Sequence, residues 1–277
     1  MFGKKKAVVV VVLLFLISLP IPPLHAQMRF GTTGLLSMPT ADMQRDKTFM
    51  LGANMTDKNM LSPYWGRSKE YNPYTYNYYI NITFFPWLEV AYTCTLVKGA
   101  HNSSYWPEQT WGKFVNQDRA FSGRLRLWKE GWWKEWTPQI VAGAIDPVNH
   151  EDHGGGDVEL GGGNTSHLTM FYLAATKHFD FKEIGTLGCH LTYVDKRWNR
   201  DDNYKRPAVG VNFKFELPDA AFLNKALNGL NLMAEYDART MNVGFNYSVW
   251  KDRFNLTAAL NDGKYLSAGV YFRISLK

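Results

Sequence analysis

Segments that alternate apolar and polar side chains recur along most of this 277-residue chain. Residues 231–248 show the pattern clearly: Leu232, Ala234 and Tyr236 lie on one face, and Asn231 and Glu235 lie on the other. A period of two is typical of a strand with two different faces and excludes a helix. The pattern therefore predicts an all-β fold, in which the apolar face points either into a soluble core or outward into lipid.

About twelve such strands follow one another, most of them about nine to eleven residues long, the length that a tilted strand needs to cross a bilayer. No internal repeat or low-complexity linker divides them, so we expect a single domain. The predicted ranges are 47–55, 75–85, 87–97, 119–128, 137–145, 168–178, 185–195, 207–217, 230–238, 241–249, 253–260 and 266–276.

The connections that follow odd-numbered strands differ in length from those that follow even-numbered strands. Those after the first, third, fifth and seventh strands are long and polar, whereas those after the even-numbered strands are mostly short. Outer-membrane barrels show this asymmetry, with short periplasmic turns and longer outer loops. The eighth connection is the longest of the even set, and we expect a helical turn within its residues 220–228. The four long connections are 56–74, 98–118, 146–167 and 196–206.

Aromatic residues gather at both sets of connections, as expected for two girdles at two membrane interfaces. We therefore predict a single transmembrane antiparallel up-and-down barrel of the outer-membrane type, with apolar side chains facing lipid. The alternative is a secreted lectin-like sandwich with exposed tryptophans. The even-numbered turns carry Trp87, Trp128, Trp132, Trp133, Trp136, Phe179, Phe181 and Trp250, and the odd-numbered loops carry Tyr64, Trp65, Tyr74, Tyr105, Trp106, Trp198 and Tyr204.

The first 26 residues have the features of a cleaved secretory signal. Lys4, Lys5 and Lys6 precede an apolar run over 7–19, which is followed by prolines and by the small residue Ala26. We then expect a periplasmic segment over 27–46, which plugs or contacts the lumen, and the barrel over 47–277.

The charge argues against nucleic-acid binding, and the positions of the cysteines argue against a disulfide. The formal charge of +6 falls to 6 − 3 = +3 when the three signal lysines are removed, too little for a nucleic-acid footprint. Cys94 and Cys189 lie on apolar faces of strands that are far apart around the barrel, so we expect no disulfide between them.

The segment GTTGLLSMPTADMQRDKTFMLGAN (31–54) resembles the start of the YjbH family of outer-membrane proteins, which are linked to exopolysaccharide secretion. Three further stretches are similar to that family: PQIVAGAIDP (138–147), FYLAATKHF (171–179) and GLNLMAEYDARTMNVGFNY (229–247). The resemblance implies a barrel that takes part in export or surface assembly of polysaccharide and implies no enzyme.

Charged side chains on the predicted inner face are the candidate site. We expect Lys214 and Glu216 to face Glu235 and Asp237 across neighbouring strands, and Arg253 to lie close to Arg273. They serve either to contact a hydrated sugar chain or to fill the interior with paired charges. The candidates are Arg124, Arg126, Lys214, Glu216, Glu235, Asp237, Arg253 and Arg273, with Glu89 and His190 on the same face.

The sequence contains only weak signals for metal binding or catalysis. The loop over 146–167 carries His150, Asp152, His153 and Asp157, which are weak metal candidates because their spacing matches no defined site. No G-x-S-x-G motif occurs, and His190 falls on the lumen face, where a hydrogen-bonded structural histidine is expected. We expect neither a cofactor nor catalysis.

Three functions stay open at this point. The favoured one is a conduit or secretion-complex component for exopolysaccharide in the outer membrane of a Gram-negative bacterium. The alternatives are a general porin for small solutes and an outer-membrane lipid-modifying enzyme. The expected partners are outer-membrane lipid, polysaccharide and periplasmic or envelope secretion proteins, and nucleic acid is not expected.

Overall fold

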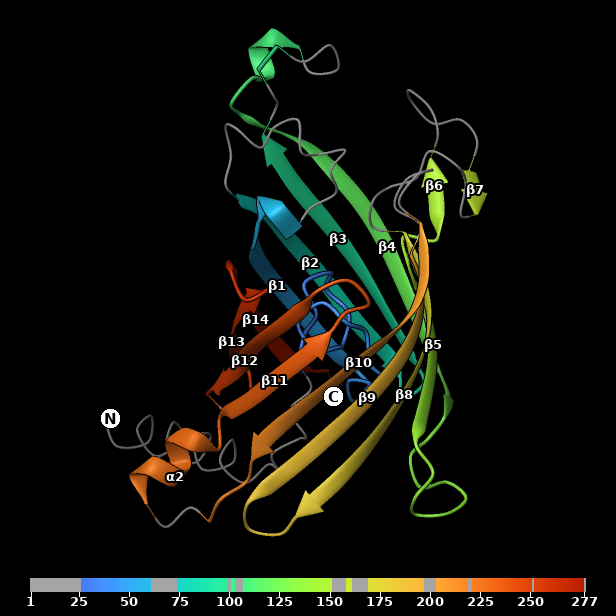
Figure 1. Ribbon diagram of the computed structural model, residues 1–277, viewed down its shortest axis with the longest axis vertical. Helices are drawn as coiled ribbons and strands as arrows, with labels where there is room; N and C mark the ends of the chain where they lie inside the picture. The colour runs from blue at the N-terminus through green and yellow to red at the C-terminus, as the bar shows by residue number, and fades with distance from the viewer. Residues whose placement is uncertain are drawn as a thin grey trace, which may run out of the picture.

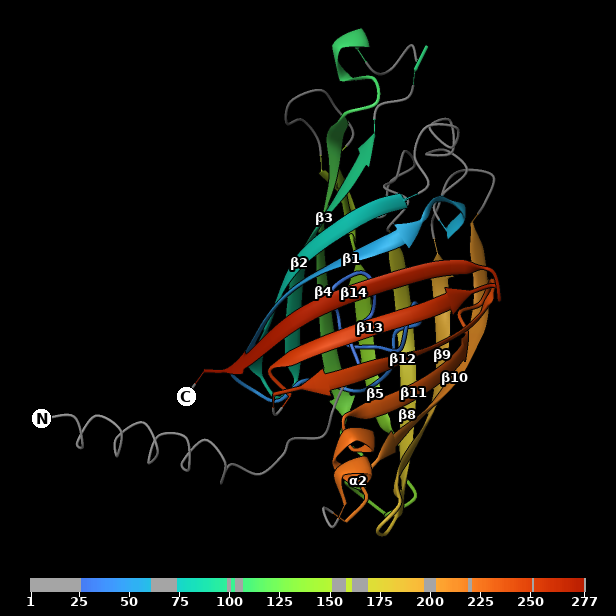
Figure 2. The same ribbon diagram turned by 90° about the vertical axis from the view of Figure 1, so that its left-hand side faces the viewer.

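Twelve antiparallel strands close into one barrel (Figures 1 and 2), which confirms the predicted fold class. The computed structural model describes residues 26–60, 74–98, 101–102, 107–150, 158–160, 169–196, 203–218, 221–250 and 252–276. The barrel strands are β1 (Thr48–Asp57), β2 (Tyr74–Phe85), β3 (Leu88–Lys98), β4 (Phe114–Trp128), β5 (Gln139–Ile145), β8 (Met170–Phe181), β9 (Gly185–Lys196), β10 (Tyr204–Phe215), β11 (Leu230–Tyr236), β12 (Met241–Val249), β13 (Phe254–Asn261) and β14 (Tyr265–Ser275).

The barrel is a simple meander in which each strand pairs with its neighbours along the chain. It closes where β1 pairs with β14, in a register that sets Thr48 opposite Ser275 and Met55 opposite Ala268. Because the closed ring has no free edge, every strand finds backbone partners on both sides, as a bilayer requires.

Short strands and a short helix lie at the two ends of the barrel. Between β5 and β8 the strands β6 (Val148–His150) and β7 (Val158–Leu160) form a separate two-stranded sheet inside the stretch predicted as a loop. At the opposite end of the barrel, the helix α2 (Phe222–Leu227) occupies the expected helical turn (Figure 2).

The outward face of the barrel is apolar, as the alternation predicted. On β2, Tyr76, Tyr78 and Ile80 are each 40% exposed, whereas Asn77 and Asn81 are buried in the interior. The strands β9 to β12 repeat this arrangement, with Leu191, Val209, Leu232 and Val243 facing outward, so a continuous apolar belt surrounds the barrel.

Exposed aromatic side chains form a girdle at the end with the short turns. They include Trp87, Trp132, Trp133, Trp136 and Trp250, which agrees with the prediction for the even-numbered turns. Of the opposite girdle, Tyr64, Trp65, Tyr105, Trp106 and Trp198 lie outside the described residues, so that girdle stays a prediction.

Both cysteines are free, as expected from their places on different strands. Within the described parts of the chain, no helix is long and apolar enough to cross a membrane.

Candidate functional site

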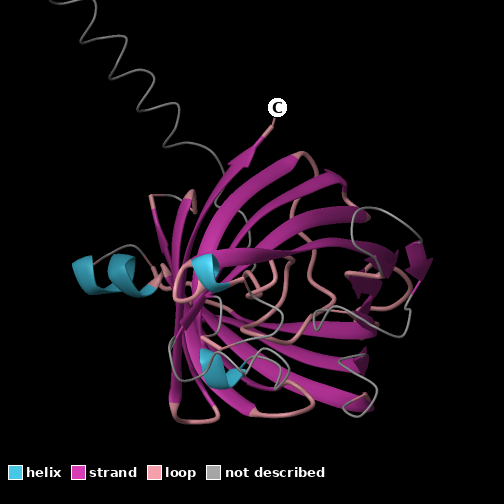
Figure 3. Cartoon of the chain, turned by 90° about the horizontal axis from the view of Figure 1, so that it is seen from above, coloured by secondary structure: helices cyan, strands magenta, loops and turns pink. Residues whose placement is uncertain are grey.

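Residues 26–46, here called the plug, run through the inside of the barrel (Figures 1 and 3). Ala26, Met28, Leu35, Met38 and Gln44 are all at most 5% exposed, and the last two residues of the segment are exposed. The sequence predicted a periplasmic position with lumen contact or plugging, and the structure places the segment within the lumen. Turns fold it back on itself, with isolated bridges between 27 and 33 and between 34 and 39.

Glu235 on β11 is a main attachment point of the plug. Its carboxylate accepts hydrogen bonds from the backbone N–H groups of Leu36 (3.0 Å), Ser37 (2.7 Å) and Met38 (3.2 Å). The side-chain amide of Asn242 on β12 donates a further bond of 2.9 Å. A carboxylate that is only 1% exposed needs such donors, because a buried charge without partners is costly.

Glu89 and Arg124 form the second attachment point, on β3 and β4. Glu89 accepts hydrogen bonds from the backbone N–H and the hydroxyl of Thr33, each 2.7 Å long. The Arg124 guanidinium donates to the backbone carbonyls of Thr33, Thr40 and Asp42. The two charges lie 4.0 Å apart, and both are buried, so they neutralise each other while they hold the plug backbone.

Two contacts anchor the end of the plug that lies toward the short turns. Arg273 on β14 donates to the side-chain oxygen of Gln44 (2.6 Å) and forms an ion pair with Asp252. On β8, the Nε2 atom of His178 lies 3.3 Å from an Asp42 carboxylate oxygen.

Glu130, in the turn after β4, holds His178 from the other side. Its carboxylate lies 2.7 Å from His178 Nδ1 and 2.8 Å from Lys177 Nζ. Burial by itself would raise the pKa of the Glu130 carboxyl, but the bonds to His178 and Lys177 lower it to about 2. The turn, the wall and the plug are therefore linked through one histidine.

Apolar contacts complete the attachment along one side of the lumen. Four plug residues pack against inward-facing side chains of β4, β5, β8, β9 and β10, so this part of the inner wall is apolar, contrary to the simple rule of a polar lumen. The cluster contains Met28, Met38, Ala41 and Met43 of the plug together with Ala120, Val141, Ile145, Met170, Tyr172, Ala174, Val194, Ala208 and Ala238.

Glycines in the wall let the plug approach the strands closely. A Cβ atom on Gly210 would lie 2.4 Å from a methyl carbon of Leu35, and one on Gly244 would lie 3.1 Å from a methyl carbon of Leu36. Atoms this close would clash at Gly210. The absence of a side chain at Gly210 is therefore part of the plug site.

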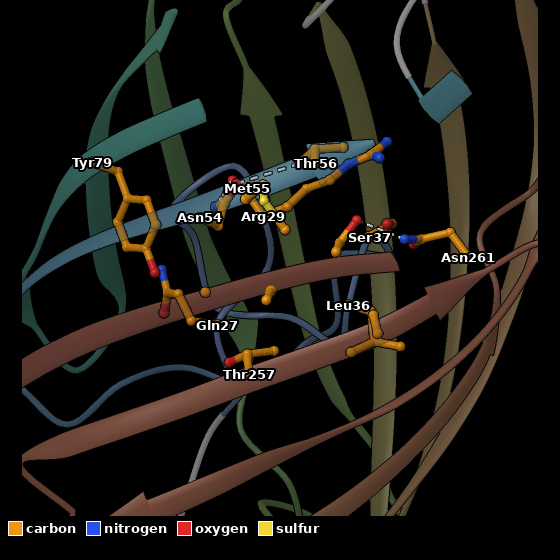
Figure 4. Close-up of a pocket in the computed structure, with 14 residues that line it drawn as sticks. Gln27, Arg29, Leu36, Ser37, Asn54, Met55, Thr56, Tyr79, Thr257 and Asn261 are labelled. Carbon is orange, nitrogen blue, oxygen red and sulfur yellow. Dashed lines mark hydrogen bonds between the residues drawn. The ribbon is translucent and has the colours of Figure 1, made fainter. Parts of the chain in front are cut away.

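Cavities between described residues lie next to the plug, and two of them bear on its role. The small one, about 30 Å³, lies between Arg29 and Ser37 of the plug and Asn54 and Asn261 of the wall (Figure 4). The other is about 550 Å³ and lies toward the short turns, between the plug and β4, β5, β8, β9, β10 and β11. The plug thus fills much of the interior and leaves a sizeable space toward the short turns.

The predicted lumen residues Arg124, Glu235, Lys214 and Arg273 are buried inside the barrel. The predicted pairing of Lys214 and Glu216 with Glu235 and Asp237 is wrong. The β10–β11 register sets Lys214 opposite Asn231 and Glu235 opposite Gly210, because the end of β10 lies beside the start of β11 in this antiparallel pair. Lys214 instead pairs with Glu216 at 2.6 Å.

Two other candidates lie in turns. Asp237 accepts hydrogen bonds from the backbone N–H groups of Arg239 (3.0 Å) and Thr240 (2.8 Å), so it caps the β11–β12 turn. The predicted closeness of Arg253 to Arg273 is confirmed only for the backbone, where a hydrogen bond joins them. The Arg253 guanidinium is stacked 5.4 Å from the Trp250 ring and takes no part in the plug site.

Sequence reasoning missed the partners on the plug itself. Thr33, Asp42 and Gln44 lie in a segment without strand periodicity, so no pattern indicated which side chain they would meet. The inward methionines and valines of β5, β8 and β9 were the available signal, since apolar residues on a lumen face require a packing partner.

His190 behaves as the sequence predicted for a structural histidine. Its ring nitrogens lie 2.9 Å from the Thr176 hydroxyl and 2.8 Å from the Asn212 side-chain oxygen. The metal candidates are not tested, because Asp152, His153 and Asp157 lie outside the described residues and only the backbone of His150 is described, in β6.

Comparison with known proteins assigns the chain to a described family. Residues 26–277 match the family model described as exopolysaccharide biosynthesis protein YbjH. The lipoprotein YjbH of Escherichia coli (strain K12) is 28% identical over 263 residues, which are 86% of this chain and 32% of that protein. The chain therefore spans about a third of the length of this curated relative.

Solved barrels are similar at a lower level. The KdgM porin in complex with disordered oligogalacturonate matches with a TM-score of 0.40 and 9% identity, over 83% of this chain and 99% of that one. The β domain of the Bordetella autotransporter BrkA matches with a TM-score of 0.37 and 10% identity, over 83% and 100%.

Proposed function

Because this chain belongs to the YjbH family of exopolysaccharide biosynthesis proteins, we propose that it forms a gated conduit for exopolysaccharide export. In this proposal the barrel sits in the outer membrane of a Gram-negative bacterium, and the plug closes the lumen at rest. One observation carries the proposal: residues 26–46 fill the interior and are held by reversible polar contacts from Glu89, Arg124 and Glu235.

The polar character of these contacts favours a gate. A barrel built only as an anchor is expected to fill its interior with side chains from its own strands. Here a separate segment supplies much of the filling, and its backbone is bound by charged side chains whose hydrogen bonds can be exchanged for water when the plug leaves. A displaced plug would leave amides, hydroxyls and charges on most of the wall, beside the apolar strip on β4, β5, β8, β9 and β10, and a hydrated sugar chain can bind to these polar groups.

A second function is favoured by the end of the barrel that carries α2. Phe222 is 89% exposed and Leu223 is 65% exposed, which is unusual for large apolar side chains. They favour a permanently closed membrane component that contacts periplasmic or envelope secretion proteins. Neither proposed function involves catalysis.

Single-channel conductance in planar bilayers tests the proposal. We expect low conductance for the intact chain and a large, stable increase after deletion of residues 28–46, because the wall is continuous without them. The paired variant Arg124→Met with Glu235→Ala should give frequent openings without shortening the chain. Glu216→Ala is the control, since it removes a carboxylate that does not hold the plug.

Equal conductance of the intact and deleted forms, with correct folding of both, would exclude the gated conduit and favour the closed component. Turnover of labelled lipid by the purified protein in detergent would instead favour the lipid-modifying alternative.

A further inference from the structure

The cavity of about 550 Å³ toward the short turns is a feature of the lumen that holding the plug does not explain. Its volume falls in the range of small-molecule binding sites. Asp42, Met43 and Gln44 of the plug line one side of the cavity, and the wall contributes charged, amide and hydroxyl groups. The wall residues used below are Arg126, Lys129, Gln139, Lys214 and Asn231.

Most carboxylates around this cavity are already paired. Glu216 pairs with Lys214, Glu130 pairs with Lys177 and His178, and Asp42 lies against His178. Among the described residues, the lining groups without an ion pair are three cations, Arg45, Arg126 and Lys129, and one carboxylate, Asp46. The unpaired charge around the cavity is therefore positive.

Arg126 is the most informative of these cations. It lies on the inner face of β4, two residues from Arg124, and it is partly buried. The Arg124 guanidinium donates to three plug carbonyls, whereas the Arg126 guanidinium makes no hydrogen bond or ion pair with any described residue. A guanidinium held partly out of water without an anion is unfavourable, and its planar fork matches a carboxylate.

Uncommitted amide groups lie in the same cavity. The Asn231 side chain accepts a bond from Asn212 but donates none that involves a described residue. Gln139 donates to the Ala41 carbonyl, and its side-chain oxygen accepts no bond from a described residue. Such groups bind hydroxyls as donors and acceptors. The cavity thus offers a cation for a carboxylate and amides for neighbouring hydroxyls.

We propose that this cavity binds a carboxylate-bearing segment of an oligosaccharide, with Arg126 as its anchor. Arg45 and Lys129, at the exposed rim, attract the anionic segment, and the amides of Asn231 and Gln139 bind its hydroxyls. This inference rests on the proposed function, since it names the class of sugar chain that would enter from the end with the short turns. It assigns acidic glycans in preference to neutral ones.

Calorimetry with the purified full chain in detergent tests the proposal with two matched sugars. A β-1,4-linked glucuronic acid trimer and cellotriose differ only in their carboxylates. We expect the uronic acid trimer to bind at least about tenfold more tightly, the difference expected for one charge-assisted hydrogen bond. That preference should weaken as salt is added, because Arg45 and Lys129 are exposed.

Arg126→Gln should remove the preference for the charged sugar, and Arg126→Lys should restore part of it by returning the charge without the fork. Arg253→Gln is the matched control, since it removes an arginine at the same end of the barrel but outside the cavity lining. On gels, each variant should migrate more slowly after heating than before heating. This difference verifies that the unheated variant forms a closed barrel.

Equal binding of both sugars, or a preference that Arg126→Gln leaves intact, would overturn the inference. Full displacement of the uronic acid by glycerol 3-phosphate at equal concentration would also overturn it, because it would indicate a lipid headgroup. These outcomes are independent of conductance: if deletion of 28–46 opens the barrel while the uronic acid fails to bind, only this inference fails.

Discussion

At the scale of single residues, the plug is held by a few buried charges on the barrel wall. Glu89, Arg124 and Glu235 satisfy backbone groups of a segment that has no regular secondary structure of its own. Strand neighbours provide these hydrogen bonds elsewhere in the barrel. Buried backbone N–H and C=O groups need partners, so these three side chains replace the missing strand partners of the plug.

We predict that Glu235→Ala loosens the plug. The change leaves the N–H groups of Leu36, Ser37 and Met38 without their acceptor, at a cost of about 1–3 kcal/mol for each group that stays buried. Urea titration of the refolded protein in vesicles, together with protease cleavage within 26–46, measures the effect. Glu235→Gln should be intermediate because it keeps one acceptor oxygen, and unchanged stability and cleavage in Glu235→Ala would contradict the role.

At the scale of elements, the turn over 129–138 is fastened to β8. Glu130 reaches Lys177 and His178, and the Lys177 side chain also donates to the carbonyl of Glu135. Because His178 also contacts Asp42 of the plug, the turn and the plug share one anchor. The sequence placed the strands on each side correctly but gave no sign of this link, since its members are separated along the chain.

We predict that acid weakens this fastening. The pKa of the Glu130 carboxyl falls from its ordinary value of 4.5 to about 2, so its stabilisation is fully present above about pH 4.5 and is lost as the pH falls toward 2. The difference in unfolding free energy between the native chain and Glu130→Gln should therefore shrink over that interval. A difference that stays constant from pH 6 to pH 2 would contradict the assignment.

At the scale of the whole molecule, an apolar outside and a largely polar inside define the barrel. Leu191 lies at the middle of β9 and is 55% exposed, and Phe181 ends β8 within the aromatic girdle and is 47% exposed. Both face outward, so only their depth in the bilayer differs. Comparing the same substitution at these two positions therefore distinguishes a lipid-embedded barrel from a soluble one.

We predict that Leu191→Arg lowers stability in vesicles by about 2–4 kcal/mol and that Phe181→Arg lowers it by about 0–1 kcal/mol, following the depth dependence of an arginine on the lipid face. Urea unfolding of both variants in the same vesicles gives the comparison. Equal effects at the two positions would indicate that no apolar bilayer surrounds the belt.

The alternating pattern was enough to predict the barrel, because a period of two gives the strand type and the direction of each side chain, which are local properties of an extended backbone. It did not determine which charges meet. Lys214 pairs with Glu216 and not with Glu235, because Lys214 lies next to the β10–β11 connection and Glu235 lies near the far end of β11. The sequence left open whether 27–46 plugs the lumen or only contacts it, and the tertiary structure decides for the plug, because the contacts of this aperiodic segment join residues as far apart as Leu36 and Glu235.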